Sequence, residues 1–151
     1  MNETYKLLPY GISDYTQIVQ ESKYIVDKTN YLEHMERAGN FLFLIRPRRF
    51  GKSVFLSMME AYYDIEKKDR FEVLFGDTYV GIHPTGLQNQ FQVLRLDFSK
   101  PGGTAGELEN KVNGYLDVVY SNFVKKYAKY YPDDYESRYF RLTSTSDRIN
   151  Y

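Results

Sequence analysis

The segment that most constrains the fold is residues 41–53. It begins with five apolar residues, Phe-Leu-Phe-Leu-Ile, and continues as Arg-Pro-Arg-Arg-Phe-Gly-Lys-Ser. A short apolar run of this kind predicts a strand buried on both faces. Downstream, Phe55, Met58 and Tyr62 recur at helical spacing, which predicts a helix over residues 51–64 with one apolar face. The sequence therefore predicts a buried strand, a loop and a helix in immediate succession.

A loop that ends Gly-Lys-Ser between a strand and a helix is typical of triphosphate-binding sites. Backbone N–H groups and the helix N-terminus surround the phosphates, the lysine reaches the outer phosphates, and the serine hydroxyl ligates Mg²⁺. Lys52 is accordingly the predicted catalytic residue, and Ser53 is the predicted magnesium ligand. The predicted nucleotide-binding residues are Arg46, Pro47, Arg48, Arg49, Phe50, Gly51, Lys52, Ser53 and Val54.

The loop departs from the usual pattern because Arg46 stands where the first glycine is expected. Pro47 restricts the backbone of the same turn, so we expect a stiff loop. Arg46, Arg48 and Arg49 add three permanent positive charges within four residues. Arginine suits bidentate phosphate contacts. Pairing of one or two of them with neighbouring carboxylates is the alternative, and both interpretations stay open here.

Three motifs in order carry a family resemblance. They are residues 8–15 (Leu-Pro-Tyr-Gly-Ile-Ser-Asp-Tyr), residues 24–29 (Tyr-Ile-Val-Asp-Lys-Thr) and residues 45–53 (Ile-Arg-Pro-Arg-Arg-Phe-Gly-Lys-Ser). Together they resemble the AAA-ATPase-like family of P-loop NTPases, found mostly in bacteria and often fused to a PD-(D/E)XK nuclease-like domain. In that family the first glycine of the phosphate loop is also replaced by arginine. Beyond residue 64 the resemblance rests on layout more than on motifs.

The resemblance implies an α/β fold, a three-layer αβα arrangement with a mainly parallel sheet. It also implies ATP binding through a variant Walker A loop, with Mg²⁺-dependent hydrolysis in the full-length protein. The family's acidic Walker B strand has no counterpart here, because residues 143–151 are polar and predict the start of a helix. We therefore expect an incomplete core: a helical lead-in over residues 1–40 and the N-terminal part of the NTPase core over residues 41–151. The fragment should bind nucleotide and hydrolyse it poorly.

Three further residues have two interpretations each. Asp97 ends the apolar run of residues 93–97 and could support Mg²⁺, or it could cap a nearby turn, which the absence of a second carboxylate favours. Asp27 and Lys28 lie in a motif shared with the family, and that implies a use such as bracing the nucleotide pocket. The alternative is a helix-capping carboxylate and a solvated lysine.

Composition limits the other functions. The 151 residues have a formal net charge of zero, which argues against a broad nucleic-acid-binding surface. The chain lacks cysteine, an apolar stretch of membrane-spanning length and a signal-peptide layout, so a cytoplasmic protein without membrane contact is expected. Two rival functions stay open. One is a nucleotide-gated regulatory module without turnover, and the other is a nucleic-acid-binding module that uses the arginine cluster.

Outside the motifs, the sequence predicts further elements. Ser13 or Asp14 caps a helix to about residue 22, and Thr29 or Asn30 caps one that Gly39 ends. Residues 71–75 favour a short helix or turn, and residues 91–98 favour a strand. A capping box of Thr104 and Glu107 predicts a long amphipathic helix to about residue 129.

Overall fold

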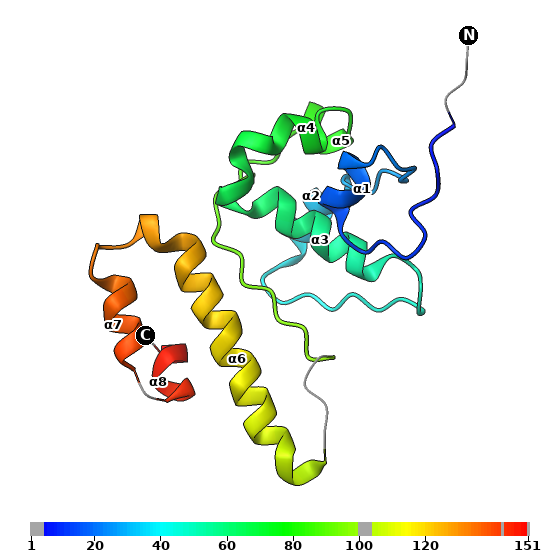
Figure 1. The fold of residues 1–151 in the computed structure, drawn as a ribbon. Helices are drawn as coiled ribbons and strands as arrows, with labels where there is room; N and C mark the ends of the chain where they lie inside the picture. Colours follow the sequence, from blue (N-terminus) through cyan, green and yellow to red (C-terminus); the bar gives the residue numbers. More distant parts are fainter. Residues whose placement is uncertain (1–4, 100–103, 143, 151) are drawn as a thin grey trace. The chain divides into compact units, whose positions relative to one another are not determined.

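The computed structural model describes residues 5–99, 104–142 and 144–150 (Figure 1). Within these residues the chain forms helices and irregular segments in two compact units, divided between Val93 and Leu94. The first unit contains the predicted phosphate loop together with the other two motifs.

The helices of the first unit begin and end where local chemistry predicts. Their bounds are α1 Tyr15–Gln20, α2 Tyr31–Ala38, α3 Lys52–Tyr63, the 3₁₀ helix η1 Ile65–Arg70, α4 Phe71–Phe75 and α5 Tyr79–Ile82. The Asp14 carboxylate accepts from Gln17 N at 2.8 Å and caps α1. Gly39 follows α2 with φ 118°, a region that glycine adopts readily. The predictions of helices over 14–22, 30–38, 51–64 and 71–75 are confirmed to within a turn.

The core of the first unit lies around the apolar face of α3. Helix α1 packs on α3 and on α4, and α4 packs on η1 and α5. Tyr62 has its ring edge-on to Phe75 at 5.5 Å between centroids, and Phe75 stacks on Tyr15 at 5.1 Å. The buried cluster comprises Tyr15, Leu32, Phe55, Met58, Ala61, Tyr62, Leu74, Phe75 and Val80. This packing holds α3, and with it the loop that precedes α3.

The second unit is built on one long helix. Helix α6 spans Ala105–Tyr127 and is followed by the 3₁₀ helix η2 (Ala128–Tyr130), α7 (Tyr135–Arg141) and α8 (Thr145–Asn150). Helices α7 and α8 both pack against α6, and Arg148 pairs with Asp117 at 3.0 Å. The predicted long helix is confirmed, and Thr104 is its N-cap residue. The side-chain part of the predicted capping box is wrong, because Thr104 makes no capping side-chain hydrogen bond.

The predicted α/β fold is wrong. The described residues contain helices and a single isolated parallel bridge between Asp64 and Phe91, with no strand ladder or sheet. Residues 41–47 form no regular secondary structure, and Phe41, Phe43 and Ile45 are about nine-tenths exposed, where a central strand would be buried. An apolar run favours a strand only where the segment can be buried. A strand also needs hydrogen-bonding neighbours, and the described chain supplies none for this segment.

The second predicted strand is wrong for the same reason. Beyond the bridge at Phe91, residues 92–98 form no regular secondary structure. Separately, the described part of the chain has no helix that is both long and apolar enough to span a membrane. The predicted boundary between residues 40 and 41 stays a prediction.

Candidate functional site

The predicted phosphate loop is a tight turn that leads directly into α3. Arg49 has φ 66° and Gly51 has φ 74°, so two residues separated by one are in the left-handed region. Turns that mix right- and left-handed residues direct neighbouring N–H groups to one side and form concavities that bind anions. Gly51 is also the N-cap residue of α3. The loop therefore has a backbone suited to an anion.

Lys52 ties the loop together. Its ammonium group donates to the Arg46 carbonyl at 2.6 Å and to the Pro47 carbonyl at 3.3 Å. The first residue of α3 thus bonds back to the start of the loop and holds the turn compact. The lysine is half-buried. Its predicted contact with the outer phosphates stays a prediction.

The N-terminus of α3 has no side-chain cap, since Gly51 offers no acceptor. The first N–H groups of a helix have no acceptor within the helix, and the helix dipole adds partial positive charge at this end. Ser53 lies on the first turn and is exposed. An anion placed there would meet several donors at once.

The three arginines of the loop have no carboxylate partners within the described residues. The Arg46 guanidinium lies over the Phe55 ring, 5.9 Å from its centroid, while Arg48 and Arg49 are exposed. Of the two interpretations above, pairing with neighbouring carboxylates does not occur in this part of the chain. The positive charge of the loop is therefore not neutralised locally.

The first motif forms a wall opposite the loop. Residues 8–12 turn through hydrogen bonds from Tyr10 N to the Leu8 carbonyl (2.9 Å) and from Ile12 N to the Pro9 carbonyl (3.3 Å). A cavity of about 610 Å³ lies between this turn and the loop. Its lining is Pro9, Tyr10, Gly11, Ile12, Ser13, Arg49, Gly51, Lys52, Ser53 and Val54. This lining contains two cationic side chains and no carboxylate.

Ser57 fixes that wall to α3. Its hydroxyl accepts from Tyr15 N at 3.0 Å and donates to the Asp14 carboxylate at 3.2 Å. Ser57 is buried and lies one helical turn after Ser53 on α3. The Tyr15 hydroxyl donates to the Leu74 carbonyl at 2.8 Å, and burial, with Asp27 adding to it, raises the pKa of Tyr15 above its usual range. Ser57 was not predicted as a site residue, because a serine within a helix has no sequence pattern that marks it as an anchor.

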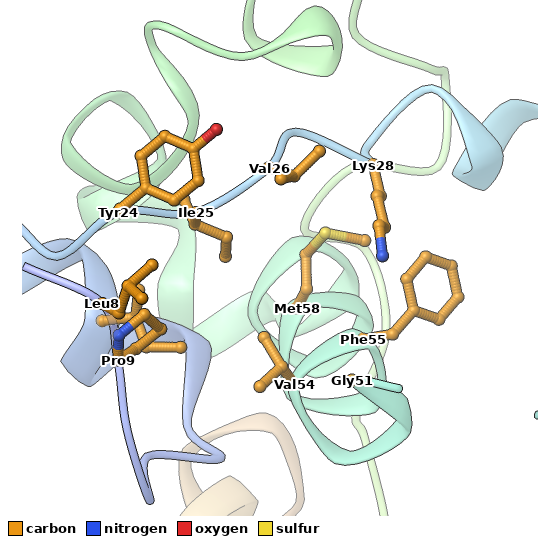
Figure 2. Close-up of a pocket in the computed structure, with 11 residues that line it drawn as sticks. Leu8, Pro9, Tyr24, Ile25, Val26, Lys28, Gly51, Val54, Phe55 and Met58 are labelled. Atoms are coloured by element: carbon orange, nitrogen blue, oxygen red, sulfur yellow. The ribbon is translucent and has the colours of Figure 1, made fainter. Parts of the chain in front are cut away.

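The second motif lines a smaller, apolar cavity of about 310 Å³ (Figure 2). Tyr24 N donates to the carbonyl of Leu7, the residue just before the first motif, at 2.8 Å and so holds the second motif beside the first. The lining is Leu8, Pro9, Ile18, Tyr24, Ile25, Val26, Lys28, Gly51, Val54, Phe55 and Met58. Pro9, Gly51 and Val54 line both cavities, so the two adjoin at the start of α3. The three motifs therefore meet around one site.

Asp27 and Asp97 do not line either cavity. The Asp27 carboxylate accepts from Thr29 N and from Tyr79 N, both at 2.8 Å, and so links the second motif to the start of α5. Asp97 belongs to the second unit, where its carboxylate accepts from Ser99 N at 3.1 Å and from the Ser99 hydroxyl at 2.6 Å. Both carboxylates organise local backbone. In the described residues no three His, Asp or Glu side chains gather as a metal site.

Comparison with known proteins places this chain in a family. A family model described as "Predicted AAA-ATPase" matches residues 9–150. A protein of Azotobacter chroococcum mcd 1, described as "Uncharacterized protein in vnfD 5'region", is 44% identical over 59 residues. Those residues make up 38% of this chain and 11% of that relative, so the matched part is a small fraction of a much longer protein. No solved structure matches the chain.

Proposed function

Because the chain belongs to the family described as Predicted AAA-ATPase, we propose that it binds ATP, with the phosphates in the loop of residues 46–53. The observation that carries the proposal is the coincidence of four features at one point. These are the left-handed turn at Arg49 and Gly51, the uncapped N-terminus of α3, the Lys52 ammonium and the unpaired arginines. Each of them favours an anion with several oxygens.

In this proposal Lys52 neutralises charge on the outer phosphates, and the loop amides hold the phosphate oxygens. Lys52 donates two hydrogen bonds to loop carbonyls, and an ammonium group has three donors, so a phosphate oxygen is a suitable third acceptor. Arg48 and Arg49 are exposed beside the same turn and supply further charge. Pro47 and Phe50 shape the turn, and Val54 continues the lining into α3.

Mg²⁺ fits the exposed Ser53 hydroxyl on the first turn of α3. Magnesium commonly keeps several waters and takes the remaining oxygens from phosphates and a few protein groups, so one hydroxyl is a sufficient protein contribution to binding. Turnover needs more, since a carboxylate usually supports the metal or the attacking water. The lining of the loop cavity contains no carboxylate. These 151 residues should therefore bind Mg²⁺-ATP and hydrolyse it slowly, and faster hydrolysis is proposed for a longer protein.

Calorimetric titration of Mg²⁺-ATP into the wild-type chain and Lys52→Met tests the phosphate assignment. Methionine keeps the apolar stem and removes the ammonium group. A hydrogen bond to a charged group contributes about 1.5–3 kcal/mol, so we expect affinity to fall at least about tenfold. Lys68→Met is the matched control, because Lys68 is exposed on η1 and lines neither cavity. Equal affinity in wild type and Lys52→Met would contradict the proposal. Duplex DNA binding that weakens steeply with salt, without ATP affinity, would select the nucleic-acid alternative.

A further inference from the structure

The apolar cavity beside the loop has an unusual lining. Apolar residues from four parts of the chain line it, with Gly51 at the edge shared with the loop cavity. They are residues 8–9, Ile18, residues 24–26, and Val54, Phe55 and Met58. Lys28 is the one lysine in this lining, which contains no arginine, histidine or carboxylate. Figure 2 shows the lysine reaching from the second motif toward α3, with its nitrogen on the side of Phe55 and Met58.

The Lys28 ammonium has no hydrogen-bond or ion-pair partner among the residues that the structure describes. The side chain is half-buried, although solvated lysines are usually exposed. The ammonium is not among the buried polar atoms, so water reaches it when the cavity is empty. A ligand that fills the cavity displaces that water and must supply an acceptor in its place. The preferred ligand is therefore mainly apolar, with a hydrogen-bond acceptor on one edge.

A nucleotide base has this chemistry, with two apolar faces and acceptor atoms along its edge. The cavity, at about 310 Å³, is at the small end of the range of about 300–1,000 Å³ typical of small-molecule sites. It also adjoins the proposed phosphate site through Pro9, Gly51 and Val54. One molecule with an apolar ring and a polyanionic tail could occupy both cavities.

We propose that this cavity binds the base of the nucleotide and that Lys28 donates a hydrogen bond to an acceptor on the base edge. The inference rests on the proposed function, since it needs the phosphates in the adjoining loop. It assigns Lys28 a direct ligand contact. Leu8 and Ile25 then lie on one side of the base, and Val54 and Met58 of α3 lie on the other.

The test compares Mg²⁺-ATP with Mg²⁺-bound inorganic triphosphate, which has no base, by calorimetric titration. The wild-type chain should bind ATP at least about tenfold more tightly than triphosphate. Lys28→Met should lose about tenfold in ATP affinity and keep the wild-type affinity for triphosphate. Lys28→Arg, which retains the charged donor, should recover part of the loss, and the control Lys68→Met should behave as wild type. Thermal unfolding of each variant checks that it is folded.

A second variant blocks the cavity without touching Lys28. Val26 lines the cavity and is more than half exposed, so the fold should accommodate Val26→Trp. This variant should lower the affinity for ATP and leave the affinity for triphosphate unchanged. Equal wild-type affinity for ATP and triphosphate, or unchanged ATP affinity in both Lys28→Met and Val26→Trp, would overturn the base site and leave the phosphate site standing. Equal losses for both ligands in Lys28→Met would place Lys28 at the phosphates and also overturn it. Failure of the phosphate site is recognised separately, by triphosphate affinity that Lys52→Met does not change.

Discussion

Gly51 is the residue on whose backbone conformation the candidate loop most depends. Its φ of 74° lies in the left-handed region, and a Cβ added there would meet no atom within 4 Å. Substitution by alanine therefore costs conformational energy without a clash. We expect Gly51→Ala to lower the free energy of unfolding by about 1–2 kcal/mol, measured by urea denaturation.

Gly86 provides a matched control for that substitution. A Cβ at Gly86 also meets nothing within 4 Å, and Gly86 is not among the residues with positive φ. Gly86→Ala should change the free energy of unfolding by no more than about 0.5 kcal/mol, or raise it slightly through the unfolded state. Equal losses in the two variants would show that the left-handed turn at Gly51 is not what the alanine disturbs.

At the scale of elements, α3 has two serines one turn apart with different surroundings. Ser57 is buried and bonded to Tyr15 N and Asp14, while Ser53 is exposed at the loop. Ser57→Ala would leave a buried N–H group without its acceptor, so we expect a loss of about 1–3 kcal/mol in unfolding free energy. Ser53→Ala should have an unfolding free energy within about 0.5 kcal/mol of the wild-type value. In this variant ATP binding should instead depend less on Mg²⁺ than in wild type. Similar losses of unfolding free energy in Ser57→Ala and Ser53→Ala would contradict these separate roles for the two serines.

The helices were predictable because their signals are local. Asp14 caps α1 and Gly39 ends α2, and the spacing of apolar residues identified α3 and α6 without knowledge of distant segments. The strands were not predictable in this way. The continuous apolar run of residues 41–45 is typical of a buried strand, but whether a neighbour pairs with it depends on the rest of the chain. Residues 41–47 form no regular secondary structure.

For the candidate site, too, local features could be predicted from the sequence and tertiary contacts could not. The loop of residues 46–53 was selected from its own motif, and the assignment of Lys52 to the outer phosphates stays a prediction, since its ammonium donates to loop carbonyls here. That Pro9 and Lys28 border the same start of α3 depends on tertiary packing, in which Ser57 anchors the first motif and Tyr24 joins the second motif to it. The sequence left Lys28 with two interpretations, and only the folded arrangement shows that it lines a cavity.

At the scale of the whole molecule, the stability of the first unit should fall at alkaline pH. Burial raises the pKa of Tyr15 and of Tyr63, and for Tyr63 the hydrogen bond to Glu36 raises it further. A folded-state pKa above the unfolded value of about 10 means that the unfolded chain loses its proton first as pH rises. Stability is thus fully present below about pH 10 and declines above it, by at most about 1.4 kcal/mol per pH unit for each tyrosine.

Urea denaturation of wild type, Tyr63→Phe and Tyr10→Phe from pH 7 to pH 11 measures this decline. Tyr63→Phe removes one of the two groups, so its decline should be shallower than that of wild type. Tyr10 is 98% exposed, and its replacement should leave the alkaline decline unchanged. A decline of the same steepness in Tyr63→Phe would contradict the assignment of the pH dependence to this buried hydroxyl.

The most direct test of nucleotide binding is two-dimensional NMR of the isotope-labelled chain with Mg²⁺ and a nonhydrolysable ATP analogue. We expect the largest chemical-shift changes at the amides of Gly51, Lys52 and Ser53, with a second group in residues 10–13 and 24–28. Amides of the second unit should show smaller chemical-shift changes than those of the loop. Unchanged loop amides at saturating analogue, or changes centred away from the start of α3, would contradict nucleotide binding at the loop.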